Sequence, residues 1–285
     1  MSWRNELNYI RKMYRKDNKL LNAAGRRTQA GRVNLHWWSP EYSDGRENIG
    51  DYLSLIVTQY LLTKKGLSLD SPIIGQKHLY AIGSIIQGGA QDATIWGSGL
   101  KHGNADIPWL AKKTRHLDIR LVRGPKTREV LLKAGFDCPS LYGDPALLLP
   151  LIYQPKSCVK TGPLVILHHA TQHQIAQAIT PLTTDYRAWL DRLVQATYVI
   201  SSSLHGIILA EAYGIPAVLL ADRATEHLFK YQDYYESTGR AHFPLARSVK
   251  EAHAITPCPI PDFSTMQADI EKSFPYDLWL GGEAL

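Results

Sequence analysis

The sequence lacks several features that define whole classes of protein. No apolar run approaches the about 20 residues that a membrane-spanning helix needs. Only three cysteines occur, and none stands in a CxxC pair, which argues against a disulfide framework and against a cysteine zinc site. The start of the sequence has neither the apolar core nor the cleavage site of a secretory signal. These absences predict a protein of the reducing cytoplasm without a metal centre.

The net positive charge of the chain is confined to the first 32 residues. Residues 1–32 hold nine basic and two acidic residues, a net charge of +7, whereas the rest holds 23 basic and 24 acidic residues. Within that segment Trp3, Leu7, Ile10 and Tyr14 form one apolar stripe at helical spacing. The pattern predicts a basic amphipathic helix that lies on an anionic membrane surface or packs on the body of the protein. Nucleic-acid binding is not expected, because that requires a basic face on the folded domain.

Short apolar runs followed by small-residue turns and helical patterns are what the sequence does contain. We predict strands at 33–38, 79–82, 93–96, 119–122, 164–167, 197–200 and 217–220, and helices at about 52–66, 129–135, 185–195, 204–213, 226–235 and 263–274. This alternation predicts an α/β fold with two Rossmann-like domains facing a cleft, at residues 33–152 and 163–285. The glycine-bearing turn after the first strand is not a GxGxxG fingerprint, so NAD binding is not predicted.

The turn at residues 201–206, with the sequence SSSLHG, lies where a predicted strand ends and a helix begins. Ligands bind at the carboxyl ends of strands in such sheets, and a helix start offers free N–H groups to an anion. Ser202, Ser203 and Leu204 are therefore candidate anion ligands, and His205 is a candidate acid or base. In the alternative interpretation the serines only cap the helix and His205 is a satisfied polar residue near the core.

Other candidates also follow predicted strands. Arg123 stands at a strand end beside a helix start, where its guanidinium could hold phosphate or carboxylate, or form an ion pair with an acid such as Asp144. The remaining candidates are Asn48, Gly50, Asp51, Gly97, Ser98, Gly99, His168, His169 and Arg247. Their alternative roles are structural, since Asn48 and Asp51 could cap a helix and the glycines could serve tight turns.

Five motifs, in this order, resemble the polysaccharide pyruvyl transferase family. They are NIGD at 48–51, WGSGL at 96–100, RGPKTREVLLKAG at 123–135, YGDPALLLP at 142–150 and SSSLHGIILAEAYGIPAVLL at 201–220. The resemblance implies a two-domain fold similar to GT-B glycosyltransferases. It also implies transfer of pyruvate from phosphoenolpyruvate to two hydroxyls of a sugar, with formation of a cyclic ketal and release of phosphate. The acceptor would be a surface polysaccharide or exopolysaccharide or its lipid-linked repeat, at the inner face of the plasma membrane, and no cofactor is implied beyond the donor.

The family's C-terminal motif, Ser-Arg-Leu-His-Gly, matches Ser202, Leu204, His205 and Gly206, but Ser203 replaces the arginine. The resemblance gives His205 the role of acid or base, or of donor to the phosphate oxygens. A further family histidine, after the first strand of the second domain, matches either His168 or His169. The missing arginine implies that another cation neutralises the phosphate, and Arg123, Lys126 and Arg247 are the candidates.

Three other functions fit parts of the pattern. The same two-domain fold could serve a glycosyltransferase that uses a sugar nucleotide, or a protein that binds sugars or anions without turnover. A third possibility is a membrane- or nucleic-acid-binding protein that acts through residues 1–32.

Overall fold

The computed structural model describes residues 30–38, 46–88, 91–103, 115–156, 159–171, 175, 178–221 and 228–281. The first half of the chain forms β1 (Arg32–His36), α2 (Ile49–Thr63), β2 (Gln76–Tyr80), β3 (Ala93–Trp96), β4 (Leu117–Leu121), α4 (Pro125–Lys133), the 3₁₀ helix η3 (Pro145–Leu148) and α5 (Leu149–Ile152). The second half forms β5 (Gly162–Ile166), α6 (Tyr186–Leu193), β6 (Ala196–Ser201), α7 (Leu204–Ala212), β7 (Ala217–Leu220), α8 (Phe229–Ser237), β8 (Leu245–Ala246), α9 (Val249–Ala252), α10 (Ser264–Lys272) and α11 (Asp277–Leu280). A short 3₁₀ helix, η1 (Ile86–Gly88), follows β2.

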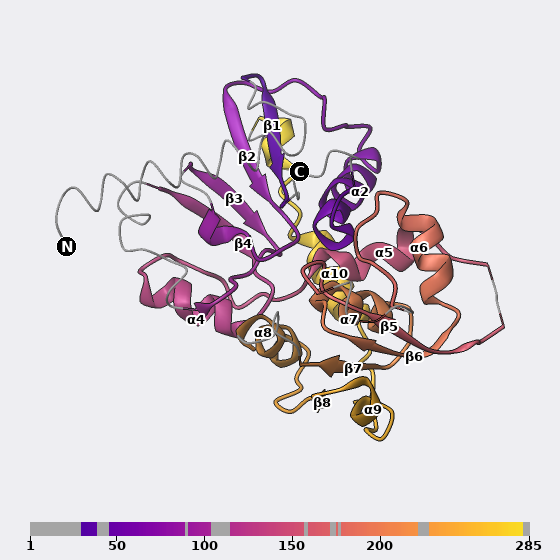
Figure 1. The fold of residues 1–285 in the computed structure, drawn as a ribbon. Coiled ribbons are helices and arrows are strands. Elements are labelled where there is room, and N and C mark those ends of the chain that lie inside the picture. Colours follow the sequence, from indigo (N-terminus) through magenta and orange to yellow (C-terminus); the bar gives the residue numbers. More distant parts are fainter. Residues whose placement is uncertain are drawn as a thin grey trace.

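Two separate four-stranded sheets organise the chain, in the orders β1-β2-β3-β4 and β5-β6-β7-β8 (Figure 1). All neighbouring strands pair in parallel. Strands β3 and β7 are buried along their whole length, as expected where helices and loops cover both faces of a parallel sheet. The predicted α/β class with two Rossmann-like units is confirmed.

Helix α2 begins earlier than its apolar pattern predicts. Leu53, Val57 and Leu61 form the buried face that the sequence indicates, and Gly66 follows the helix with φ 67°. The helix starts at Ile49, however, so the NIGD motif forms its first turn instead of a preceding loop. This places Gly50 and Asp51 on a rigid element.

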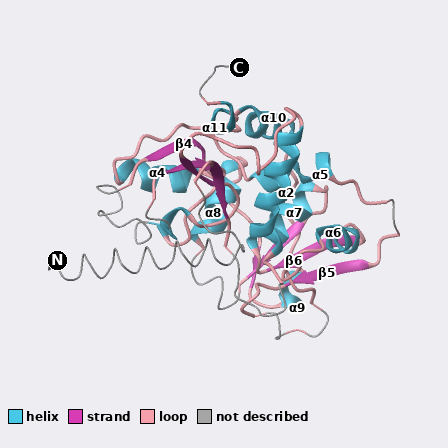
Figure 2. Cartoon of the chain, turned by 90° about the horizontal axis from the view of Figure 1, so that it is seen from above, coloured by secondary structure: helices cyan, strands magenta, loops and turns pink. Residues whose placement is uncertain are grey.

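We call the part of the chain with the sheet β1-β2-β3-β4 the first unit and the part with the sheet β5-β6-β7-β8 the second unit. The two units share one hydrophobic core. Helix α2 of the first unit contacts α7 of the second, and η3 contacts both helices (Figure 2). The chain also returns to the first unit at its end, where Trp96 Nε1 donates to Ile270 O at 3.1 Å and Tyr276 Oη donates to Leu61 O at 2.9 Å. The domain limits at 33–152 and 163–285 stay a prediction, and α10 and α11 pack on the sheet of the first range.

Two predictions concern the N-terminal segment and the membrane. The predicted amphipathic helix falls almost entirely in residues 1–29, which lie outside the described residues. Among the helices that the structure describes, none combines the length and the apolar character needed to cross a bilayer.

Candidate functional site

The carboxyl ends of the two sheets meet at the junction of the units. Trp38, just beyond β1, lies with its ring centroid 4.7 Å from that of His169, which follows β5. The first turn of α2 touches the first turn of α7 through Gly50 and His205. Residues that follow the strands β1 and β5 and residues at the starts of the helices α2 and α7 are thus brought to one region.

The serines of the SSSLHG turn build the turn itself. Ser201 Oγ accepts from Ser203 N at 3.0 Å and donates to Ser203 O at 2.9 Å. Ser202 Oγ accepts from His168 N at 2.9 Å, which ties the end of β5 to the end of β6. Ser203 occupies the N-cap position of α7 without a capping bond from its side chain. The side chain of Ser203 therefore does not cap α7, and the N–H groups at the start of this helix have no side-chain cap from it.

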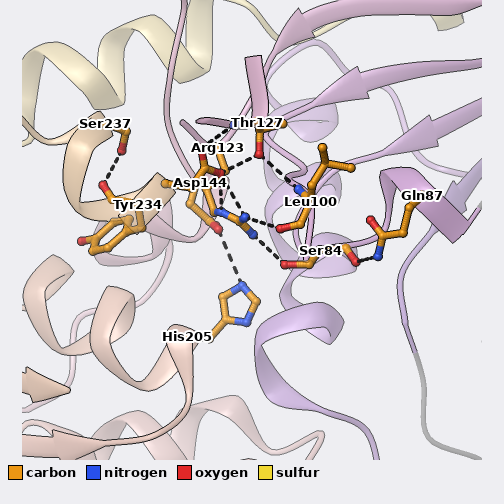
Figure 3. Close-up of polar contacts among 10 residues, drawn as sticks. Ser84, Gln87, Leu100, Arg123, Thr127, Asp144, His205, Tyr234 and Ser237 are labelled. Carbon is orange, nitrogen blue, oxygen red and sulfur yellow. Dashed lines mark hydrogen bonds and ion pairs between the residues drawn. The ribbon is translucent and has the colours of Figure 1, made fainter. Parts of the chain in front are cut away.

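His205, on the first turn of α7, faces Asp144 across the junction. Its Nε2 lies 3.6 Å from Asp144 Oδ2, and Figure 3 shows the imidazole directed at that carboxylate. Both atoms are buried without a hydrogen-bond partner in the described part of the chain. Asp144 is held by its other oxygen, which accepts from Ala146 N at 3.0 Å. The pair therefore has hydrogen-bonding capacity to offer to a ligand.

The absence of a side chain at Gly50 leaves the space that the imidazole of His205 occupies. A Cβ built on Gly50 would lie 1.9 Å from Nδ1 of the imidazole. The backbone of Gly50 does not have a positive φ, so the position requires glycine for space and not for conformation. The candidate Gly50 thus contributes to the site by letting the histidine ring lie against α2.

Asp51 adds a second titratable group from α2. Burial raises its pKa from 3.8 to about 7, with a further upward contribution from Asp144, while His205 and Lys230 act in the opposite direction. Its carboxylate lies against the backbone after β2, because a Cβ on Gly83 would be 2.3 Å from Oδ1. A carboxyl with such a pKa can hold or release a proton near neutral pH.

Lys230, in the first turn of α8, is the residue at this junction that the sequence did not single out. It is 8% exposed, and its charge acts on Asp51 of the first unit and on His168 and His169 of the second. The sequence signal was absent because a lysine in a helical pattern is normally a solvent-facing residue.

His168 and His169 lie together beside Lys230. Burial, together with the charges of Lys230 and Lys101, lowers the pKa of His168 to about 3 and that of His169 to about 4. Their ring centroids are 4.0 Å apart. Both histidines are therefore neutral at physiological pH, and they can act as hydrogen-bonding groups but not as cations.

Arg123 is buried in an ion pair. The side chain is 1% exposed, its Nε donates to Asp233 Oδ2 at 3.0 Å, and Nη1 donates to Ser84 Oγ at 2.7 Å (Figure 3). Nη2 donates to Leu100 O at 2.7 Å. The ion-pair alternative is thus the arrangement observed, with Asp233 of α8 as the partner in place of Asp144. Binding of a donor by Arg123 stays an untested expectation, and each of its nitrogens already contacts a protein oxygen.

Three other candidates near the strand ends serve this packing. A Cβ on Gly99 would lie 2.4 Å from the guanidinium carbon of Arg123, and one on Gly97 would lie 2.2 Å from Pro145 Cδ. Ser98 Oγ donates to Ala81 O at 2.7 Å. All three are fully explained by close contacts between protein groups.

The last candidates are spread more widely. Asn48 is the N-cap residue of α2 and makes no capping bond through its side chain. Arg247 is exposed and follows the edge strand β8, and Lys126 pairs with Glu236 at 3.1 Å. Within the described ranges, no group of three or more His, Cys, Asp or Glu is placed to hold a metal ion.

Comparisons with known proteins add a family. A sequence profile described as polysaccharide pyruvyl transferase matches residues 48–222. An uncharacterised protein of Acanthamoeba polyphaga mimivirus is 26% identical over 212 residues, which cover 67% of this chain and 71% of that protein. The crystal structure of a functionally uncharacterised protein from Klebsiella pneumoniae aligns over 79% of this chain and 93% of its own, with a TM-score of 0.49 and 14% identity. The range matched by the profile contains Asp51, Asp144 and His205, and it ends before Lys230.

Proposed function

The chain belongs to the polysaccharide pyruvyl transferase family, and on this premise we propose that it transfers pyruvate from phosphoenolpyruvate to two hydroxyls of a carbohydrate. The carbohydrate is a surface polysaccharide or exopolysaccharide sugar, or its lipid-linked repeat. The observation that carries the proposal is the contact between Nε2 of His205, on the first turn of α7, and Oδ2 of Asp144, at 3.6 Å. That turn combines a titratable group with a helix N-terminus suited to an anion.

The proposed reaction needs two additions to the same carbon. A first sugar hydroxyl attacks C2 of phosphoenolpyruvate and loses its proton, while a proton is delivered to the C3 methylene. A second hydroxyl then attacks C2, and the bond between C2 and the phosphate oxygen breaks. Phosphate leaves with the electron pair and a cyclic ketal remains. Each addition requires one group that takes a proton, and the first also requires one that gives a proton.

His205 and Asp51 supply these groups in the proposal. His205 acts as the acid or base, and Asp144 orients its ring and stabilises the imidazolium when it forms. Asp51, with a pKa of about 7, is the second group that can carry a proton at neutral pH. The carboxylate and phosphate of the donor would occupy the N-terminal end of α7.

Product analysis tests the proposal. Inorganic phosphate released from phosphoenolpyruvate would be measured with a panel of galactosides, mannosides and glucosides, and the added pyruvate would be detected by mass. We expect acceptor-dependent release of phosphate together with a ketal product. Release of a nucleoside diphosphate from a sugar nucleotide, without phosphate from phosphoenolpyruvate, would identify a glycosyltransferase instead. Binding of ligand without either product would identify a binding protein.

The proposal includes a place of action. Repeats built on lipid carriers are presented at the inner face of the plasma membrane, and residues 1–32 carry a net charge of +7. We propose that this segment brings the enzyme to the anionic surface.

A further inference from the structure

Lys230 is fixed beside the SSSLHG turn by its neighbour in the chain. Tyr231 Oη donates to Ser202 O at 2.7 Å, and Lys230 Nζ lies 4.9 Å from the centroid of the Tyr231 ring. Both residues belong to the first turn of α8. Helix α8 is therefore anchored to the backbone of the turn that precedes α7, and it holds the ammonium group of Lys230 beside that turn.

A second anchor holds α8 from the opposite unit. Asp233, fully buried and less than one turn further along the helix, accepts from Arg123 Nε at 3.0 Å and from Thr127 N at 2.8 Å. Gly124 allows this approach, since a Cβ there would lie 1.9 Å from Asp233 O. Because α8 is bonded to both units, the position of Lys230 is set by the junction as a whole.

The surroundings of Lys230 combine several features that favour an anion. Lys230 and Lys101 act together on His168 and His169, which are neutral. The N-terminal end of α7 adds its positive partial charge at the adjacent turn. The charge of Lys230 also acts on Asp51, whose pKa is raised by burial to about 7, so this acid is largely protonated below about pH 7. Buried His205 Nε2, which has no hydrogen-bond partner among the described residues, can donate to an anion at the same junction.

We propose that Lys230 binds the phosphate group of the donor at the N-terminal end of α7. The identity of the donor rests on the proposed function, whereas the presence of an anion site at Lys230 does not. Ser203 brings no charge to this turn, so the lysine of α8 provides the cation from another element.

The experiment compares Lys230→Met and Lys230→Arg with the wild-type full chain. Binding of inorganic phosphate and of phosphoenolpyruvate would be measured by calorimetry, and the pKa values of His168 and His169 by NMR titration. We expect Lys230→Met to weaken binding of both anions by about 10- to 100-fold, the range for a lost charge-assisted hydrogen bond. Lys230→Arg should restore most of the binding. The KM for phosphoenolpyruvate should rise more than kcat falls.

Two controls show whether a change in phosphate binding comes from the position of Lys230, from the loss of any positive charge or from misfolding. Lys133→Met removes an exposed lysine that pairs with Glu129 within α4, and it should leave phosphate binding unchanged. In Lys230→Met the pKa values of His168 and His169 should rise, because the ammonium that disfavours the imidazolium forms is gone. This second readout reports where Lys230 lies without reference to catalysis.

The outcomes distinguish the two proposals. Weaker phosphate binding in Lys230→Met, in a protein that never turns over phosphoenolpyruvate, would support the anion site and overturn the proposed function. Normal binding of phosphate and phosphoenolpyruvate by Lys230→Met would overturn the assignment of Lys230, whatever the activity. Failure of the wild-type protein to bind either anion at millimolar concentration would also overturn the assignment of Lys230.

Discussion

At the scale of single residues, His205 is the group on which the proposed chemistry depends most. Its Nε2 has no hydrogen-bond partner in the described part of the chain and lies 3.6 Å from Asp144 Oδ2, and a glutamine of similar length can fill the place of the ring against Gly50. His205→Gln should therefore lower kcat by about 10²- to 10⁴-fold, the usual contribution of general acid–base catalysis. The free energy of unfolding should change by less than about 1 kcal/mol.

Steady-state phosphate release and chemical denaturation would measure the two effects of His205→Gln. Asp144→Asn keeps the shape of the partner but removes its charge, and it should lower kcat less than His205→Gln does. Turnover at the wild-type rate in His205→Gln would exclude the histidine as acid or base.

The raised pKa of Asp51 leads to a prediction about the stability of the protein that does not depend on the reaction. Its pKa is about 7 in the folded protein, against about 3.9 for an unfolded aspartate. Between these values the unfolded chain binds fewer protons than the folded one, so this group lowers stability as the pH rises from about 4 to about 7. Asp51→Asn cannot ionise and should not lose stability in this window.

Urea denaturation at about pH 5 and about pH 8 would reveal the effect of Asp51. The free energy of unfolding of Asp51→Asn, relative to that of wild type, should be about 2–4 kcal/mol higher at about pH 8 than at about pH 5. This is the free energy that corresponds to the raised pKa. Asp70→Asn, at an exposed ion pair with Arg32, is the matched control and should show no such change. An equal difference at both pH values would mean that Asp51 ionises like a solvated carboxylate.

At the scale of elements, the Arg123–Asp233 pair joins the ends of β2, β3 and β4 to α8. Both side chains are at most 1% exposed, and breaking a buried pair leaves a charge without its partner. Asp233→Asn should lower the free energy of unfolding by about 3–5 kcal/mol. Arg123→Lys keeps the charge but loses guanidinium hydrogen bonds to Ser84 and Leu100, so it should cost about 1–3 kcal/mol. Donor binding should weaken in both, because α8 carries Lys230.

Arg120→Lys is the control for this pair, since Arg120 forms exposed ion pairs with Asp118 and Asp277 and should cost less than about 1 kcal/mol. If Arg123→Lys weakened donor binding and left stability unchanged, Arg123 would be a direct ligand of the donor. Denaturation and calorimetry on the same preparations separate these results.

Local patterns were enough to predict most elements and the turns between them. Apolar runs located seven of the strands, because each run is buried by its own neighbours in the sheet. The two-residue strand β8 was missed, since its pairing with β7 defines it and its sequence does not. The start of α2 was placed too late because its first turn contains Gly50, a poor helix former, and lies before the apolar pattern that begins at Leu53.

Contacts between distant segments were beyond such patterns. An ion pair of Arg123 was the alternative to ligand binding, with a nearby acid such as Asp144 as the partner, but the partner in the structure is Asp233, 110 residues away. Lys230 was seen only as a helical position, and its role at the junction arises from the packing of α8 between the units. The five motifs, in contrast, indicated the family correctly, and the profile match confirms it.

At the scale of the whole molecule, the return of the chain to the first unit ties its end to β3. Trp96 is fully buried, and its Nε1 donates to Ile270 O at 3.1 Å and to Ser273 Oγ at 3.2 Å. Trp96→Phe should lower the free energy of unfolding by about 1–2 kcal/mol through the lost hydrogen bond and the volume removed from the core, although Ile270 O keeps its bond from Ser273 Oγ. It should also increase amide hydrogen exchange in residues 264–280.

Trp189→Phe is the matched control, because Trp189 Nε1 donates to Thr180 O at 2.9 Å within the second unit. The two variants should lose similar stability, and only Trp96→Phe should affect exchange in α10 and α11. Unchanged exchange there in Trp96→Phe would mean that the packing of α10 does not depend on this bond.

The uneven charge of the chain leads to the last prediction. Residues 1–32 carry +7 while the rest carries −1, so attraction to an anionic surface would come from this segment. The full chain should co-sediment with vesicles of phosphatidylserine and phosphatidylcholine at low salt and be released at high salt. Vesicles of phosphatidylcholine alone should not retain it. Replacing Arg11, Lys12, Arg15 and Lys16 by glutamine should weaken binding at least about tenfold, because each basic residue near the surface contributes about 1 kcal/mol. Turnover of a soluble acceptor should stay unchanged in that variant, and vesicle binding that is absent or insensitive to salt would separate this segment from any membrane role.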